Sequence, residues 1–414
     1  MIEGASSSIH ADGSQDWLNS VRNDCNGETA MAMALTHLLT EEGTGRGTAY
    51  ALCDYVCFTS PISTGPRANP DSPTYGLMQW TTADALGGIY YGDDNARSLL
   101  GIMAAAAAMD SPRWDRHLLK CLLANLRTSG PTGFRARRLN DDEIQEKGWQ
   151  HFFELNEPIY HPHYESYLWA CFLWAYEHTG FTPFLERART AISMTMHAYP
   201  EQWSWTNGIQ QERARMVLPL AWLVRADDTP EHREWLKQIT SELLAHQDSC
   251  GAIREEIGSA GLGHYGPPKT NEDYGTSEAP LIQANGDPLC DLLYTTNFAF
   301  IGLHEAAMAT GDESLIAASD RLAEFLVRVQ VESNAHPELD GAWFRAFEYK
   351  RWDYWASNAD LGWGAWSIES GWTQGWITAV LAMREMNTSL WDLTANTRIG
   401  DHADQLTKMM LPGE

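Results

Sequence analysis

Basic residues are scarce in this chain of 414 residues. Lysine and arginine together number 29, against 55 aspartates and glutamates, and the formal net charge at pH 7 is -26. A surplus of negative charge this large repels phosphate backbones and anionic membranes across the distance that physiological salt leaves unscreened. The composition therefore argues against nucleic acid as a partner.

Long apolar runs are missing as well. No segment comes near the roughly 18 consecutive apolar residues that a membrane-spanning helix needs. The opening sequence MIEGASSSIHADGSQDW has neither the basic nor the apolar region of a signal peptide. We therefore expect no membrane partner. The localisation stays open, because a signal peptide removed during maturation would leave no trace in this sequence.

The cysteines follow no pairing pattern. There are seven, an odd number, and none belongs to a CxxC motif. Four of them, Cys53, Cys57, Cys121 and Cys171, lie in apolar segments, where a thiol packs as a small hydrophobic group. We predict buried free thiols, and unpaired cysteines of this kind favour a cytoplasmic protein.

Several common catalytic motifs are also absent. The P-loop, GxSxG and HExxH patterns do not occur, so nucleotide, α/β-hydrolase and zinc-protease chemistry lose their usual sequence support. His161 and His163 in YHPHYESYLW have a spacing found among metal ligands, but no third ligand is evident. We expect no metal and no cofactor.

What the chain does contain is a long series of helical patterns. Apolar residues recur with the period of an α-helix in twelve segments, and no long alternating strand pattern is found. The segments span residues 27–40, 46–59, 94–109, 112–128, 163–178, 182–198, 209–226, 230–247, 291–310, 314–332, 372–386 and 400–411.

Odd-numbered and even-numbered segments differ in character. Odd ones, such as 94–109 and 163–178, are apolar nearly all round, whereas even ones, such as 314–332, are amphipathic. The links that lead into the odd segments are long, and the links that leave them are mostly short. The sequence therefore predicts an all-α double ring of six helical hairpins, with odd helices inside, even helices outside and the long loops at one end.

This pattern resembles the (α/α)6 toroid of the six-hairpin glycosidase superfamily and of related polysaccharide lyases and sugar epimerases. The resemblance covers nearly the whole chain, which we interpret as one domain of residues 1–414 with residues 1–25 as an N-terminal extension. It implies an oligosaccharide or polysaccharide substrate. It does not choose the reaction, because one fold carries several chemistries. Nothing in the sequence indicates the oligomeric state.

Tryptophan is unusually frequent, with 18 residues in the chain and seven of them between residues 343 and 376. Indole rings stack on the apolar faces of sugars, while the hydroxyl edges of a sugar need polar partners. The candidate sugar contacts in this segment are Trp363, Trp366, Trp372, Arg345, Asn358 and Glu369, with Asp360 as a candidate base or nucleophile. The alternative is that the loop packs its own aromatics as a small core.

A second cluster lies in TNGIQQERARM, at the start of an inner helix. It supplies Asn207, Gln211, Glu212 and Arg213. Charged groups at such a position are costly unless they are paired or used. Glu212 is the candidate general acid, because partial burial would raise its pKa, and the other three are candidate substrate contacts. A structural ion pair between Glu212 and an arginine is the alternative.

Three further sites complete the set. In YYGDDNARSLL we expect one of Asp93 and Asp94 to cap the helix, and Asp94 is a candidate base or nucleophile. Glu278 in TSEAP has small and apolar neighbours, so we expect it to be buried in the site. His163 and Tyr164 are candidates for substrate hydrogen bonding or proton transfer.

These candidates favour an exo-acting glycoside hydrolase, in which one carboxyl group protonates the leaving oxygen and another acts as base or nucleophile. Three alternatives stay open. A polysaccharide lyase would neutralise a uronate with a cation and remove a proton with Tyr164, His163 or Tyr274. A sugar epimerase or isomerase would use His163 with His264. A non-catalytic glycan-binding module would use the tryptophans alone.

Overall fold

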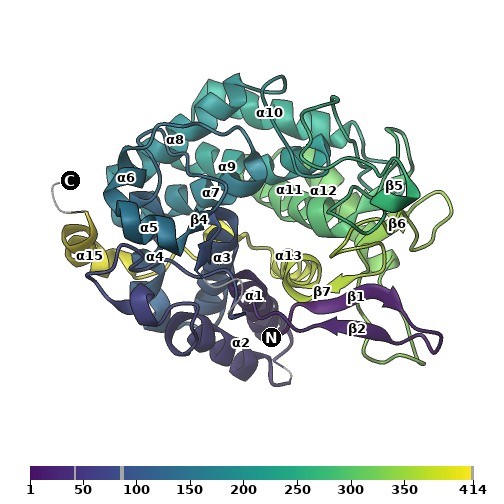
Figure 1. Cartoon of the computed structure of the whole chain (residues 1–414), viewed down its shortest axis with the longest axis horizontal. Helices are drawn as coiled ribbons and strands as arrows, with labels where there is room; N and C mark the ends of the chain where they lie inside the picture. Colours follow the sequence, from purple (N-terminus) through teal and green to yellow (C-terminus); the bar gives the residue numbers. More distant parts are fainter. Residues whose placement is uncertain (42, 84–87, 412–414) are drawn as a thin grey trace.

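Six helices form a closed inner ring in the computed structural model, which describes residues 1–41, 43–83 and 88–411. Each inner helix packs against the next, and α13 packs against α1 to close the ring (Figure 1). The inner helices are α1 (Asn23–Thr40), α3 (Gly92–Ala108), α7 (Pro162–Thr179), α9 (Ile209–Ala226), α11 (Asn297–Thr310) and α13 (Trp376–Glu385). They correspond to the odd-numbered segments of the sequence pattern.

Five outer helices each pack on the inner helix that precedes them. They are α2 (Gly45–Asp54), α4 (Asp115–Arg127), α8 (Thr182–His197), α10 (Pro230–Leu244) and α12 (Glu313–Arg328). The last outer helix, α15 (Ala403–Met410), packs against α4 and so lies beside the second hairpin. The predicted all-α toroid is confirmed.

Burial explains why the two classes of helix differ in sequence. In α7 the run from Glu165 to Ala175 is buried without a break, because α3, α8 and α9 cover its different sides. In α12 the buried apolar residues form one stripe, which includes Leu315, Leu322 and Phe325, and the remaining faces are in water. Apolar periodicity therefore identified the ring to which each helix belongs.

Short elements in the links escaped the sequence analysis. The additional helices are α5 (Asp141–Lys147), α6 (Trp149–Glu154) and α14 (Leu390–Leu393). Three π-helical turns, Tyr55–Thr59, Leu292–Thr296 and Ser370–Gly375, adjoin α2, α11 and α13. In the described part of the chain, 3-10 turns cover Gly65–Ala68, Pro112–Trp114, Asn271–Asp273 and Ile399–His402. The three additional helices and the turns Gly65–Ala68 and Asn271–Asp273 are too short to produce a periodic apolar pattern, whereas the other turns lie within or overlap segments that the sequence predicts to be helical.

Short strands tie the links together. β1 (Gly4–Ile9) pairs antiparallel with β2 (Gln15–Leu18) and with β7 (Ile368–Glu369). β3 (Ile89–Tyr90) pairs with β4 (Leu139–Asn140), and β5 (Leu289–Asp291) pairs with β6 (Ala346–Glu348). The segment interpreted as an N-terminal extension thus forms a hairpin beside the last inner helix, and its residues 23–25 already belong to α1.

The long links all meet at the N-terminal end of the inner ring, because each of them leads into an inner helix. Residues 84–87 of the link between residues 60 and 93 lie outside the described residues. Along the described ranges, no helix has both the length and the apolar character needed to cross a bilayer. The four cysteines predicted to be buried are buried and have free thiols.

Close packing of α1 on α3 depends on two glycines that face each other. A Cβ at Gly101 would lie 2.3 Å from the carbonyl oxygen of Gly27. Gly101→Ala should therefore lower the free energy of unfolding by about 2 kcal/mol or more, because backbone would have to move. Gly47→Ala is the matched control, since Gly47 lies in α2 with no atom within 4 Å of the added Cβ. It should leave stability unchanged or raise it. Equal chemical denaturation midpoints for the two variants would contradict this packing.

Candidate active site

A cavity of about 580 Å³ opens at the N-terminal end of the inner ring. Every inner helix contributes to it with its first turn or with the residues just before it. Its lining consists of Glu3, Ser20, Arg22, Trp80, Tyr91, Asp93, Asp94, His163, Tyr164, Thr206, Tyr265, Thr276, Ser277, Glu278, Leu293, Tyr294, Leu361, Gly362, Trp363, Glu369 and Trp372. We call this the central cavity.

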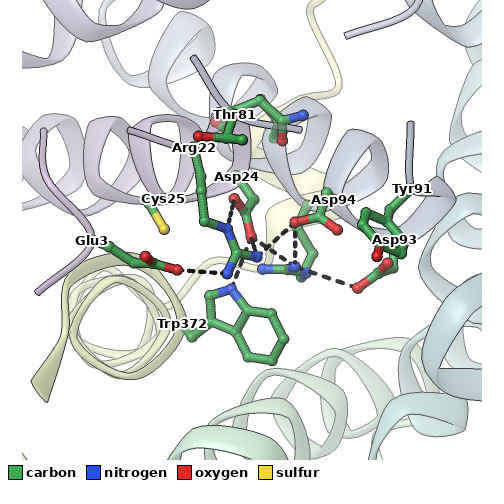
Figure 2. Close-up of polar contacts among 12 residues, drawn as sticks. Glu3, Arg22, Asp24, Cys25, Thr81, Tyr91, Asp93, Asp94 and Trp372 are labelled. Atoms are coloured by element: carbon green, nitrogen blue, oxygen red, sulfur yellow. Dashed lines mark hydrogen bonds and ion pairs between the residues drawn. The ribbon is translucent and has the colours of Figure 1, made fainter. Parts of the chain in front are cut away.

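Two buried arginines collect carboxylates on one side of the central cavity. We define the arginine–carboxylate network as Arg22, Asp24, Glu28, Asp93, Asp94 and Arg97. Arg22 donates to Glu3 Oε1 at 2.9 Å, to Asp24 Oδ2 at 2.6 Å and to Asp94 Oδ1 at 2.7 Å (Figure 2). Its guanidinium is therefore already engaged by three carboxylates.

Arg97 is fully buried and joins α3 to α1. Its guanidinium nitrogens lie 2.9 Å from Glu28 Oε1, 2.7 Å from Asp24 Oδ2 and 3.3 Å from Asp93 Oδ2. The Trp372 ring centre lies 4.0 Å from the guanidinium carbon, and its indole N–H donates to Asp24 Oδ2 at 2.8 Å. Carboxylates and an aromatic face thus replace the water that this cation has lost.

The network corrects one expectation about Asp93 and Asp94. The N-cap residue of α3 is Tyr91, with no side-chain cap, and both aspartates lie in the first turn, so the capping prediction is wrong. Burial and the neighbouring Asp24 and Asp93 raise the pKa of Asp94 well above its usual range. Burial opposes ionisation of Asp24 too, but Arg22 and Arg97 hold its pKa below the usual range.

His163 lines the central cavity at the start of α7. Gln211 donates from Nε2 to its Nδ1 at 2.6 Å, which leaves the proton on Nε2, 3.9 Å from Asp93 Oδ2. Burial, Arg215 and other nearby cations lower the pKa of His163 well below its usual range. The imidazole is therefore neutral.

Most residues of the TNGIQQERARM cluster lie behind the cavity lining, where they hold His163 in position through hydrogen bonds. Glu212 is fully buried outside the lining, where Oε2 accepts the backbone N–H of His163 at 2.5 Å. Asn207 is buried behind the lining, and its backbone N–H donates to the Gln211 side chain. Arg213 points the other way and bonds Tyr199, Gln210, Glu256 and Glu242. Glu212 as general acid stays a prediction that this placement does not favour.

Glu278 lies in the lining on a loop, half-buried. Burial and the neighbouring Asp360 carboxylate raise the pKa of Glu278 to about 7. Burial raises the pKa values of the Tyr164, Tyr265 and Tyr294 hydroxyls, and the negative charge of Glu278 raises them further. Glu278 therefore has a proton available near neutral pH in an aromatic setting.

Several loop candidates shape the loop instead of lining the cavity. Arg345 is buried between Asp291 and Asp360, at 2.9 Å and 3.1 Å. Asp360 also accepts backbone N–H groups of residues 279, 362 and 363. The Asn358 side chain accepts from Ala365 N, and the Trp366 indole donates to a backbone carbonyl. The loop packs partly as its own core, which was the alternative interpretation.

Three loop candidates do reach the central cavity: Trp363, Glu369 and Trp372. Burial and Glu28 raise the pKa of Glu369 well above its usual range, and its Oε1 accepts from the Cys25 thiol at 2.7 Å. Its Oε2 accepts the Trp372 backbone N–H. The nearby Gly371 lets the backbone approach α1, since a Cβ there would lie 2.3 Å from the Glu28 carboxylate.

Arg22, Trp80, Tyr91 and Tyr294 also line the central cavity, although no pattern in the sequence pointed to them. Arg22, Tyr91 and Tyr294 come from the residues that lead into an inner helix. That position is a usable signal once a toroid is assumed. Within the described ranges, no group of three or more His, Cys, Asp and Glu side chains is arranged to hold a metal ion.

Comparison with known proteins identifies the architecture. No family model and no curated protein matches the sequence. Among solved structures, the chain is similar to a D-mannose isomerase, with 13% identity, 90% of each chain covered and a TM-score of 0.56. The chain is also similar to a sugar epimerase from a ruminal bacterium, with 9% identity, 92% of each chain covered and a TM-score of 0.56. For an unsaturated glucuronyl hydrolase specific for heparin, the identity is 9%, the TM-score is 0.56, and the match covers 94% of this chain and 92% of the hydrolase. The chain therefore has the six-hairpin (α/α)6 toroid fold.

Two tryptophans of the lining should respond differently to truncation. Trp372 is 6% exposed and packs on Arg97, so Trp372→Ala should lower the free energy of unfolding by about 3 to 5 kcal/mol. Trp363 is only half-buried, so Trp363→Ala should cost about 1 to 2 kcal/mol. Urea denaturation of both variants measures the difference. Equal losses would show that Trp363 belongs to the core as much as Trp372 does.

Proposed function

We propose that the chain is a glycoside hydrolase that removes a terminal sugar from a neutral glycan. The observation that carries the proposal is a pair of carboxyl groups in one cavity lining, one with a raised pKa and the other paired with arginines. Glu278 has a pKa raised to about 7, and Asp93 lies 3.3 Å from Arg97 and 3.6 Å from Arg215. Glycoside hydrolysis needs one carboxyl group that holds a proton and one that is ionised.

The proposal assigns a role to each group. Glu278 protonates the leaving oxygen, and Asp93, which pairs with Arg97 and Arg215, acts as base or nucleophile. Asp94, which with Asp360 is one of the two bases or nucleophiles expected from the sequence, has a raised pKa and is assigned to hydrogen bonding of a sugar hydroxyl. Trp363 and Tyr164 supply stacking faces, and His163 donates from Nε2 to the substrate.

A uronate lyase fits this lining less well. The lining contains five acidic side chains, Glu3, Asp93, Asp94, Glu278 and Glu369, and one basic side chain, Arg22, which is already engaged. Removal of a proton beside a carboxylate needs a cation that is free to neutralise the substrate. Cations beside the lining include Arg137, whose guanidinium carbon lies 5.9 Å from the Tyr164 ring centre, and Arg138, whose side chain bonds Tyr91, and a uronate would need to recruit one of them.

A sugar epimerase or isomerase is the second candidate, because one specific observation favours it. Neutral His163 lines the central cavity with Asp93 nearby, a suitable arrangement for proton exchange beside a carbonyl. The similar solved structures include a sugar epimerase and a mannose isomerase. The expected partner His264 is exposed and lies outside the lining, so a two-histidine mechanism has less support.

The acid role of Glu278 has a sharp kinetic test. Glu278→Gln should lower kcat on disaccharides about 10²- to 10⁴-fold. It should affect nitrophenyl glycosides much less, because a good leaving group needs little protonation. Since the pKa of about 7 is raised, the proton is present below that pH, and wild-type kcat/KM on disaccharides should fall as pH rises through about 7. The variant should lack this fall.

Glu272→Gln is the matched control, because Glu272 is exposed on the same loop. It should keep wild-type rates and pH dependence. Sugar release from a disaccharide panel is followed beside exchange of solvent deuterium into free mannose and glucose. Deuterium exchange without any sugar release would overturn the hydrolase and favour the epimerase or isomerase. An unsaturated product from uronate-containing glycans would overturn both.

A further inference from the structure

A second hollow of about 790 Å³ lies on the outer side of the loops that border the central cavity. We call it the outer groove. Its lining is Pro268, Lys269, Thr270, Asn271, Tyr274, Leu281, Gln283, Asp287, Pro288, Leu289, Glu348, Lys350, Arg351, Trp355, Ala356 and Ser357. It shares none of these residues with the central cavity.

Two large aromatic side chains are exposed in the outer groove. Tyr274 is 50% exposed and Trp355 is 46% exposed. Both are held in place: the Tyr274 hydroxyl lies 3.1 Å from Ser357 Oγ, and the Arg351 guanidinium carbon lies 4.8 Å from the Trp355 ring centre. Ordered aromatic surface left in water in a hollow is typical of a binding site.

The charged groups of the outer groove are largely engaged by the protein itself. Lys350 pairs with Asp248 at 2.9 Å, and Arg351 pairs with Glu348 at 3.3 Å. The Asp287 carboxylate accepts two backbone N–H groups from residues 283 and 284. A ligand would therefore meet aromatic faces and uncharged hydrogen-bonding groups more than free charge. This combination suits the apolar face and hydroxyl edge of a neutral sugar.

The outer groove and the central cavity share a wall made of two loops. Residues 270–278 give Tyr274 to the groove and Glu278 to the cavity, and residues 355–363 give Trp355 to the groove and Trp363 to the cavity. Hydrogen bonds join the two loops, from Gly275 N to Ala359 O at 2.8 Å and from Leu361 N to Ser277 O at 3.0 Å. The aromatic surface of the groove thus lies on the same loops as the proposed acid.

We propose that the outer groove is a second binding site for a neutral oligosaccharide, separate from the central cavity. This proposal rests on the proposed carbohydrate function, which supplies the class of ligand. It adds that glycans of several sugar units are held on the outside of the loop wall by Trp355 and Tyr274. Longer oligosaccharides should therefore gain binding affinity from the outer groove, whereas disaccharides should not.

The test is calorimetric binding of hexasaccharides from the cellulose, starch, mannan and xylan series. Glu278→Gln protein is used, so that the ligands are not consumed. At least one series should bind, and adding Trp355→Ala should weaken its binding about tenfold or more. The matched control adds Trp17→Ala instead, because Trp17 is 53% exposed on the N-terminal hairpin and outside both linings. It should leave the affinity unchanged, and thermal melts should show both proteins folded.

The outcomes separate this proposal from the proposed function. Unchanged affinity in the Trp355→Ala protein would overturn the outer groove as a sugar site, whatever the rate of disaccharide hydrolysis. Failure of every hexasaccharide to bind would overturn it as well, while release of sugar from disaccharides by the wild type would leave the hydrolase standing. Weakened hexasaccharide binding without disaccharide hydrolysis would support the groove and overturn the hydrolase. Tyr274→Phe, which removes the bond to Ser357 and keeps the ring, should weaken binding less than Trp355→Ala does.

Discussion

The rest of the site depends on the ion pairs between the buried Arg97 guanidinium and the surrounding carboxylates. The guanidinium joins the carboxylates of α1 to those of α3, and it supports the Trp372 indole that precedes α13. A guanidinium at this depth is stable only while carboxylates and an aromatic face replace its lost hydration. The helices that close the ring and the polar lining of the central cavity therefore stabilise each other.

The same geometry explains why acidic side chains gather there. Six inner helices begin at the central cavity, and each N-terminal end carries partial positive charge and unpaired N–H groups. Asp24, Asp93, Asp94 and Glu212 all lie in first turns of these helices. Because so many carboxylates in a small volume repel one another, Arg22, Arg97 and Arg215 are buried among them. The helix N-termini thus favour the acidic side chains, and the buried arginines offset the repulsion between them.

Helical periodicity was sufficient to predict the ring, because burial on all sides or on one side leaves a direct pattern in the sequence. The same reasoning placed Asp94, His163, Tyr164, Glu278 and Trp363 at the end where the cavity lies.

The sequence pattern could not fix the direction of each side chain. Glu212 is in the first turn of α9 yet points behind His163, since one residue along a helix turns a side chain by about 100°. The Arg345–Asp360 pair lies in irregular loops, where spacing carries no such signal. Arg22 was missed because the segment before α1 was interpreted as an extension.

The network also bears on which substrates the central cavity accepts. Arg22, the basic residue of its lining, already bonds Glu3, Asp24 and Asp94. An anionic sugar that took the place of one of these carboxylates on Arg22 would leave a buried carboxylate without its partner, which costs several kcal/mol. A neutral hydroxyl only exchanges one hydrogen bond for another, which costs little. The preference for neutral sugars that we propose therefore needs no dedicated contact, because it follows from the ion pairs that hold the ring of helices together.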